Sequence, residues 1–248
     1  MECPRSGEVV SMLFKNVVRS CVPRTWIVRM LGFFAPKCNI GRGVYIAPSA
    51  QLIGASNISI GNNSFISERT LINVNHRQFG ELEVVIGDNC FIGRENFFSS
   101  GKAIDIGHYT LTTTGCKFIC SSHVVDDPMV PYMSSGTTST DAIRIGVNCF
   151  FGACSMVVGN VSIGWGSVVG ASTLVTSDIP PFSMVVGSPA RVVKRYSFVR
   201  KAWIRIGLLG SDEDLGHPDE ADYLAQLRAV SPNLSMPLIA ASSHFGNL

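Results

Sequence analysis

The sequence lacks several features that would assign it to a common functional class. Its 248 residues contain no run of 18 apolar residues, so no membrane-spanning helix is expected. The eight cysteines are scattered without CxxC pairs, which gives no zinc-site spacing. No secretory signal pattern accompanies them, and together these observations favour a reducing, cytoplasmic compartment.

Charged residues are also scarce. They make up 15% of the chain, against about 25% in an average globular protein. The 20 Lys and Arg residues against 18 Asp and Glu residues leave a net charge of +2, which gives little support for a nucleic-acid partner. A chain with so few charged residues fits a protein that buries much of its surface against other subunits.

Composition divides the chain into three segments. Residues 1–37 are basic and apolar, with a break at Pro23, and we expect them to form short amphipathic helices. Residues 38–190 are repetitive, and residues 191–248 form a helical and irregular extension that starts basic and then turns acidic. Within this extension "HPDEADYLAQLRAV" (217–230) has proline and acidic residues in its first turn, which predicts a helix.

The middle segment repeats with a period of six. Its units include IGRGVY (40–45), IGNNSF (60–65), IGDNCF (86–91), IGHYTL (106–111) and IGVNCF (145–150). The first position is almost always a large apolar residue, and the fifth is usually small. A helix would not repeat at six, and an ordinary half-buried strand alternates at two.

Such a unit describes one short strand and a tight turn, and three units make one coil of a triangular prism. The first and fifth side chains would point inward and stack on their equivalents in the next coil. Glycine at the second position is expected to allow turn φ values that a side chain would oppose. We interpret Cys90 and Cys149, both at fifth positions, as small core residues rather than redox groups.

The repeat and the ending "SDIPPFSMVVGSPARVVKRY" (177–196) resemble the hexapeptide-repeat acyltransferases, and most of all the sugar O-acetyltransferases of the galactoside and maltose type. The resemblance covers roughly residues 38–196. It implies an all-β solenoid, namely a left-handed parallel β-helix with short helical extensions. It also implies acetyl-CoA as co-substrate, no metal, and a homotrimer with active sites between neighbouring subunits.

The repeat fails after the unit that begins at Phe118 and resumes at Ile145, which predicts a protruding loop over about residues 124–143. His123, in "SSHVVDDP" (121–128), is the last residue of its unit and should point outward at the root of this loop. Loops of this length are more often functional than accidental. Because imidazole can take a proton near neutral pH, and because the resemblance places a catalytic histidine in such a loop, we predict that His123 is the general base. The alternative is an ordinary exposed loop histidine.

Three carboxylates compete to orient His123. Asp105 precedes it by 18 residues, one full coil in an uninterrupted register, and would stack directly below it at about 4.8 Å. Asp126 and Asp127 are alternatives, although they could instead bind acceptor hydroxyls or begin the loop. The remaining histidines are interpreted as structural or solvated groups: His76, His108, His217 and His244.

The resemblance also implies substrate contacts. The family uses an asparagine on the acceptor side, but the corresponding stretch "RENFFSSGKA" (94–103) offers Ser99 and Ser100, so the donor to the tetrahedral intermediate stays unassigned. Because they are cationic, Arg191 and Lys194 are better candidates for binding phosphate than Thr176 and Ala171, which could equally be plain turn residues. The positions that match coenzyme A contacts in the family are Phe150, Ala153, Ala171, Thr176, Arg191 and Lys194.

We therefore predict an acetyl-CoA-dependent O-acetyltransferase that acts on a sugar hydroxyl, in the synthesis of bacterial surface polysaccharide or lipid-linked oligosaccharide. The open alternatives are N-acetylation of an amino sugar, a metalloenzyme similar to the β-helical carbonic anhydrases, and a non-catalytic trimeric scaffold. The metalloenzyme would require three converging histidines, for which the chain offers His76, His108 and His123.

The basic segment 1–37 has two further interpretations. Its Arg and Lys residues alternate with Trp26, Phe33 and Phe34, a composition that could hold the protein peripherally to an anionic inner membrane surface. The same segment could instead cap the open strand edges of the first coil. The two roles are compatible.

Overall fold

A computed structural model describes residues 38–77, 80–209 and 216–232. The chain divides into two compact units, Met1–Cys38 and Asn39–Leu248, and everything below concerns the second. The helices expected in residues 1–37, with their membrane or capping role, lie outside the described residues. In the ranges that the structure describes, no helix is long and apolar enough to cross a membrane.

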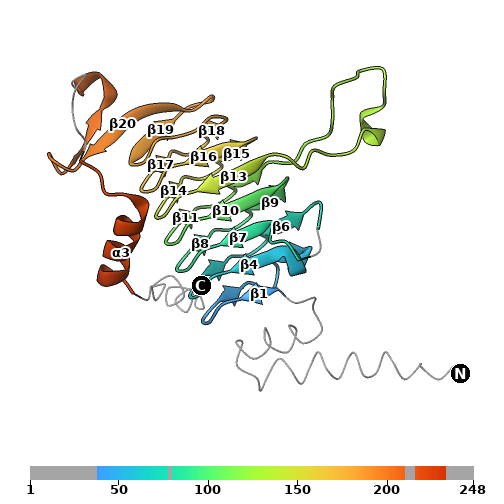
Figure 1. Cartoon of the computed structure of the whole chain (residues 1–248), viewed down its shortest axis with the longest axis horizontal. Coiled ribbons are helices and arrows are strands. Elements are labelled where there is room, and N and C mark those ends of the chain that lie inside the picture. Colours follow the sequence, from blue (N-terminus) through green and yellow to red (C-terminus); the bar gives the residue numbers. More distant parts are fainter. Residues whose placement is uncertain (1–37, 78–79, 210–215, 233–248) are drawn as a thin grey trace, which may run out of the picture. The chain divides into compact units, whose positions relative to one another are not determined.

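Residues from Asn39 onward form a parallel β-helix of three sheets, as the six-residue repeat predicts (Figure 1). Each turn of the chain adds one short strand to each sheet in the order A, B, C. Sheet A contains β1 (Asn39–Ile40), β4 (Ile58–Ile60), β7 (Val84–Ile86), β10 (Ala103–Ile106), β13 (Ala142–Ile145) and β16 (Val161–Ile163). Sheet B contains β2 (Tyr45–Ile46), β5 (Phe65–Ile66), β8 (Phe91–Ile92), β11 (Leu111–Thr112), β14 (Phe150–Phe151), β17 (Val168–Val169), β19 (Ser183–Val186), β20 (Arg191–Ser197) and β21 (Ala202–Arg205). Sheet C contains β3 (Gln51–Ile53), β6 (Leu71–Val74), β9 (Phe97–Ser100), β12 (Lys117–Ile119), β15 (Met156–Val158) and β18 (Leu174–Val175).

The core is a column of stacked side chains along the prism axis. First-position residues from Ile60 onward are buried, whereas Ile40 in the first coil is 38% exposed. Aromatic first-position residues stack on one another: the rings of Phe98 and Phe118 lie 4.8 Å apart and nearly parallel, and Phe118 meets Phe151 edge to face. Fifth-position residues are buried beside them, including Ser64, Thr110 and Cys149. The predicted inward pattern of one large and one small residue per unit is therefore confirmed.

The predicted role of the second-position glycines is wrong. The positive φ of each turn occurs at the fourth position, for example 56° at Asn63, 57° at Asn89 and 54° at Asn148. The second-position glycines instead allow the next coil to approach. A Cβ on Gly107 would lie 2.5 Å from the carbonyl carbon of Gly146, closer than carbon atoms can pack.

One long excursion leaves the prism between β12 and β13. It contains a short 3-10 helix, η2 (Tyr132–Ser134), and an isolated antiparallel bridge between His123 and Thr137 that closes its root. Figure 1 shows this excursion projecting away from the coils. We call residues 120–141 the hairpin.

The C-terminal extension differs in part from expectation. The predicted helix is α3 (Glu220–Val230), whose N-cap Asp219 accepts a hydrogen bond from the Asp222 amide at 2.8 Å. Two strands were not predicted: β20 and β21 add antiparallel to the end of sheet B. Two further 3-10 helices are η1 (Ala55–Asn57) and η3 (Ile206–Leu208).

Candidate functional site

The candidate site lies at the corner where sheet C passes into sheet A, which we call the open corner. On successive coils this corner is formed by residues 75–77 with 80–83, residues 101–102 and the hairpin, because Val74 pairs with Ser100 and Ser99 pairs with Ile119 in sheet C. Two of these three connections are insertions into the repeat. The open corner therefore carries most of the irregular sequence of the prism.

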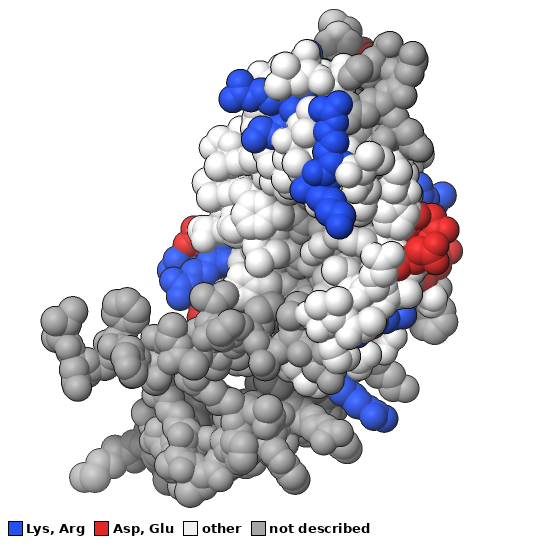
Figure 2. All heavy atoms as spheres, turned by 90° about the vertical axis from the view of Figure 1, so that its left-hand side faces the viewer, with Lys and Arg blue, Asp and Glu red and all other residues white. Residues whose placement is uncertain are grey.

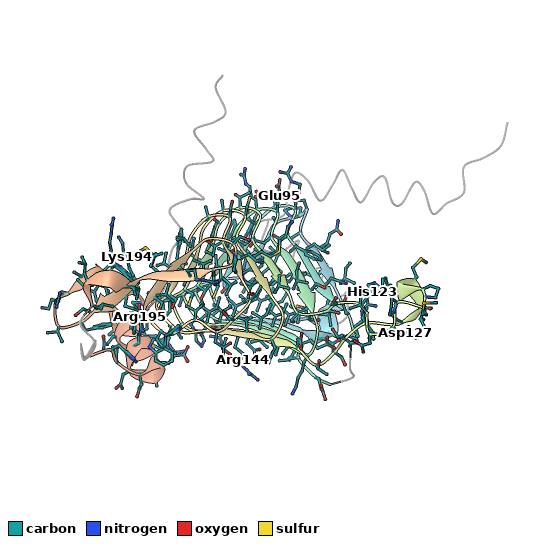
Figure 3. The ribbon with its side chains drawn as sticks, turned by 90° about the horizontal axis from the view of Figure 1, so that it is seen from above. Glu95, His123, Asp127, Arg144, Lys194 and Arg195 are labelled. Atoms are coloured by element: carbon teal, nitrogen blue, oxygen red, sulfur yellow. The ribbon has the colours of Figure 1, made fainter. Side chains whose placement is uncertain are left out.

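His123 stands at the root of the hairpin, exposed to solvent, as the sequence predicts. Backbone pairing fixes its position: the Thr138 amide donates to the Ser122 carbonyl at 2.7 Å and the Val124 amide donates to the Gly136 carbonyl at 3.1 Å. Figure 3 shows His123 near the base of the hairpin, with Asp127 farther out. Its imidazole makes no hydrogen bond within the described part of this chain, so it is available to a substrate.

A buried polar chain lies beside this root. The Asn75 side-chain amide donates to the Ser100 carbonyl at 2.8 Å and to the Ser99 hydroxyl at 3.0 Å. The Ser100 hydroxyl donates to a carboxylate oxygen of Glu83 at 3.1 Å, and both of these residues are buried. Buried polar groups that are mutually bonded make a rigid structure, because breaking one bond leaves its partner unsatisfied.

His76 follows this chain and contacts the hairpin. Its Nε2 lies 3.0 Å from the Thr138 carbonyl oxygen, next to the residue that bridges His123. The sequence interpretation of His76 as a merely structural or solvated group missed this contact. The available signal was positional, because "NVNHRQFGELE" interrupts the repeat at the same corner as the hairpin.

A cavity of about 490 Å³ opens at this corner. It has polar walls from both insertions and from the turn between them, and its volume lies in the general range of small-molecule sites. The lining residues are His76, Glu81, Glu83, Gly101, Lys102, Ser139 and Thr140.

Asp105 does not stack under His123, so that prediction is wrong. Its neighbours in sheet A are Val85 on one side and Arg144 on the other. The chain leaves the prism at residue 120, before it reaches sheet A, and Arg144 takes the position that counting in sixes assigned to His123. Burial raises the pKa of Asp105, and the charge of Arg144 offsets part of this effect.

The other predicted acceptor-side residues have different placements. Asp126 and Asp127 are exposed on the hairpin, and a carboxylate oxygen of Asp127 accepts from the Met129 amide at 2.9 Å, as a turn residue does. Ser99 is 9% exposed and Ser100 is fully buried. Ser100 thus supports the wall of the site and does not reach its surface.

Most of the predicted coenzyme A contacts lie away from the open corner. Ala153 and Ala171 stack on successive coils at the corner between sheets B and C, where the Ser172 amide donates to the Ala153 carbonyl at 2.8 Å. Phe150 is 41% exposed on the outer face of sheet B. Thr176 follows β18 and lies on the open corner, above the hairpin.

Arg191 and Lys194 lie on β20, at the end of the prism. Lys194 is directly opposite Arg205 of β21, and two like charges so placed favour an anion between them. Figure 2 shows Lys and Arg side chains gathered near this end. Figure 3 shows Lys194 and His123 on opposite sides of the prism.

The three histidines required for a metalloenzyme do not converge. The Nδ1 atom of His108 accepts from the Asp88 amide at 2.8 Å, at the corner between sheets A and B, far from His76 and His123 on the open corner. No group of three or more His, Cys, Asp or Glu side chains suited to a metal occurs in residues 38–77, 80–209 and 216–232.

Comparisons with known proteins agree with this fold. The model of the hexapeptide repeat of succinyl-transferase matches residues 83–95 and 142–177. A probable acetyltransferase of Mycobacterium tuberculosis is 31% identical over 155 residues, which cover 62% of this chain and 49% of the relative. A putative acetyltransferase of Staphylococcus aureus is 35% identical over 112 residues, 45% of this chain and 55% of the relative. The galactoside O-acetyltransferase of Escherichia coli is 29% identical over 155 residues, 62% of each chain.

Solved structures show the same fold at lower identity. An N-acyltransferase from Bacillus cereus, solved as a mutant with coenzyme A and dTDP-4-amino-4,6-dideoxyglucose, superposes with a TM-score of 0.58 at 21% identity, over 71% of this chain and 91% of that one. The chain spans about half the length of the first two curated relatives. The repeat and the three-sheet prism show a left-handed β-helix of hexapeptide repeats, and the chain is similar in sequence to the acetyltransferases named above.

Proposed function

We propose that this protein is an acetyl-CoA-dependent O-acetyltransferase that acts on a sugar hydroxyl, with His123 as the general base. The observation that carries the proposal is an exposed imidazole, without a hydrogen bond to any described residue, held at the root of the hairpin near a polar cavity of about 490 Å³. Curated relatives named as acetyltransferases, one of them acting on galactosides, support the reaction class.

The reaction needs one proton carrier. His123 takes the proton of the acceptor hydroxyl as its oxygen attacks the thioester carbonyl, which gives a tetrahedral intermediate and an imidazolium. The carbon–sulfur bond then breaks, and the imidazolium returns the proton to the thiolate of coenzyme A. The products are an acetyl ester and free coenzyme A, and His123 ends neutral.

The acceptor binds in the cavity of the open corner in this proposal. Thr140, Ser139 and Lys102 offer hydrogen bonds to ring hydroxyls, and the buried chain from Asn75 to Glu83 keeps the wall rigid. Asp126 and Asp127, exposed near His123, are available to acceptor groups that extend from the cavity.

The donor site requires a second copy of the chain. Ala153 and Ala171 are separated from His123 by the width of sheet C, about six residues or roughly 20 Å along a strand. A pantetheine arm that follows these alanines of one subunit reaches the His123 of a neighbour when corners of two prisms meet. We therefore propose a homotrimer, with Phe150 and Thr176 along the donor groove and with Arg191 and Lys194 binding the nucleotide phosphates.

The amine of an amino sugar is the alternative acceptor. The Bacillus cereus structure was solved with such a sugar nucleotide, but at 21% identity it establishes the fold alone. The same base and the same cavity would serve either nucleophile. The assay must therefore use acceptors that distinguish a hydroxyl from an amine.

The test is thiol release from acetyl-CoA with matched acceptors: a sugar, its 2-amino and 4-amino analogues, and an oligosaccharide. We expect turnover with a hydroxyl acceptor and a loss of about a hundredfold in His123→Ala, with unchanged acetyl-CoA binding. Turnover that survives in His123→Ala would remove His123 as the base, and turnover restricted to the amino sugars would replace O-acetylation by N-acetylation.

A further inference from the structure

The hairpin root is held to the prism by a side chain that the proposed mechanism does not use. The Thr138 carbonyl oxygen lies 3.0 Å from Nε2 of His76 and also accepts from the Ser121 hydroxyl at 3.3 Å. Thr138 belongs to the return strand of the hairpin, and its amide donates to Ser122, the neighbour of His123. The contact of His76 therefore acts on the backbone that places His123.

The geometry defines the protonation of His76. A carbonyl oxygen can only accept, so Nε2 must carry the hydrogen, as it does in one neutral tautomer and in the imidazolium. The other neutral tautomer would place two acceptors face to face. A glutamine side chain can present an amide N–H at the same reach, whereas alanine cannot.

His76 is itself held firmly by its neighbour. The backbone amide of Asn75 donates to the Ser100 hydroxyl at 3.3 Å, and the Asn75 side chain bonds to Ser99 and Ser100. Ser100 is in turn bonded to the buried Glu83. Residue 75 is thus bonded to the next coil through Ser99 and Ser100, which fixes the backbone from which His76 reaches the hairpin.

His123 has no such support of its own. Its ring makes no hydrogen bond within the described part of the chain, and most of the hairpin beyond it is exposed, including Met129 at 88% and Met133 at 95%. The orientation of His123 depends on its backbone, and its backbone depends on the paired strand that carries Thr137 and Thr138.

We propose that His76 is a positioning residue: it binds the Thr138 carbonyl and so holds the hairpin root, and with it His123, in the geometry needed for proton transfer. The inference rests on the proposed function for its effect on turnover, but its structural part does not. Small displacements of a catalytic group can cost up to about a hundredfold in rate, so a loosened root is measurable.

The experiment compares His76→Ala, His76→Gln and a matched control, His108→Ala, which removes a histidine with a backbone hydrogen bond at a different corner. Each variant is checked for fold by circular dichroism and thermal melting. Amide hydrogen exchange is then measured at Val124 and Thr138, and kcat and KM are measured with acetyl-CoA and the best acceptor.

We expect His76→Ala to exchange the Val124 and Thr138 amides about tenfold faster, with β9 and β12 unchanged, and to lose about tenfold in kcat with KM for acetyl-CoA within about twofold. His76→Gln should recover both readouts to within about threefold of wild type. His108→Ala should exchange its hairpin amides at the wild-type rate. The pH at which activity falls on acidification should be the same in His76→Ala as in wild type, since His123 remains the base.

Unchanged exchange in His76→Ala would overturn the proposal, whatever the activity. Loss of activity that glutamine does not restore, together with a displaced pH profile, would make His76 a titrating catalytic group instead. If wild type transfers no acetyl group to any acceptor, the proposed function fails, while the exchange measurements still decide whether His76 holds the hairpin.

Discussion

Two corners of the same prism differ in how regular their connections are. At the corner between sheets A and B, which we call the closed corner, each coil passes through the same tight turn and the second-position glycines pack on the coil above. At the open corner the connections are unequal in length, and one of them leaves the prism as the hairpin.

The closed corner is also covered. The Val147 amide donates to Glu220 of α3 at 2.8 Å, Trp165 donates to the Pro218 carbonyl at 3.2 Å, and Tyr109 donates to the Ser231 carbonyl at 2.9 Å. A cavity of about 690 Å³ remains between its turns and Arg228 and Pro232. The open corner differs in exposing the His123 imidazole, near its own cavity of about 490 Å³. The candidate base therefore stands where the repeat is broken, and the regular turns carry no candidate base in the proposed function.

The largest effect is expected from Gly107→Ala at the closed corner. The new Cβ would lie 2.5 Å from the Gly146 carbonyl carbon and 2.7 Å from the Val147 nitrogen, both backbone atoms that cannot move alone. We expect the free energy of unfolding to fall by about 3 kcal/mol, measured by urea denaturation at one protein concentration. The matched change Gly136→Ala, in the hairpin, meets open space and only the strain of φ +78°, and should cost about 1 kcal/mol. Equal losses would remove the distinction between the corners.

Cysteine thiols buried inside the closed corner should react more slowly than a thiol on the surface of the prism. Burial raises the pKa of Cys90 and of Cys149 to about 12, so almost no thiolate forms at pH 8, while Cys154 is exposed. We expect iodoacetamide to modify Cys154 at least about tenfold faster than Cys90 or Cys149, followed by peptide mass spectrometry. Comparable rates in the folded protein would mean that the corner opens.

A smaller loss is expected from Glu220→Ala. It removes the carboxylate that accepts from the Val147 amide and leaves that amide without its partner on α3. The melting temperature should fall by an amount that corresponds to about 1 kcal/mol. Asp126→Ala, on the exposed hairpin, is the control and should melt like wild type. A melting temperature of Glu220→Ala equal to that of wild type would show that α3 does not stabilise the closed corner.

The smallest effect concerns Asp105→Asn, on sheet A between the corners. Because burial raises the pKa of Asp105, its ionisation disfavours the folded state, and this cost appears as pH rises through the ordinary aspartate range. Asn should therefore raise the melting temperature slightly at pH 7 and leave it unchanged at pH 3, with kcat within about twofold of wild type. A lower melting temperature at pH 7 would mean that the attraction of Arg144 outweighs burial, and a large loss of kcat would restore Asp105 to the catalytic site.

The sequence alone determined the β-helix, the inward stack of first- and fifth-position residues, the place of the hairpin and the helix at 220–230. These features depend on local periodicity and on capping residues, which the sequence records directly. The sequence singled out His123 as the candidate base because it stands where that periodicity stops.

The tertiary structure decided which residues of different coils are neighbours. Insertions change the residue count per coil, so Arg144 rather than His123 lies beside Asp105, and His76 reaches Thr138 across 62 positions. The close approach of coils explains the glycines, because a steric limit between distant backbones leaves no local signal. Periodicity fixes the path of the chain within a coil, whereas the contacts that build the site are made between coils, after unequal loops have set their register.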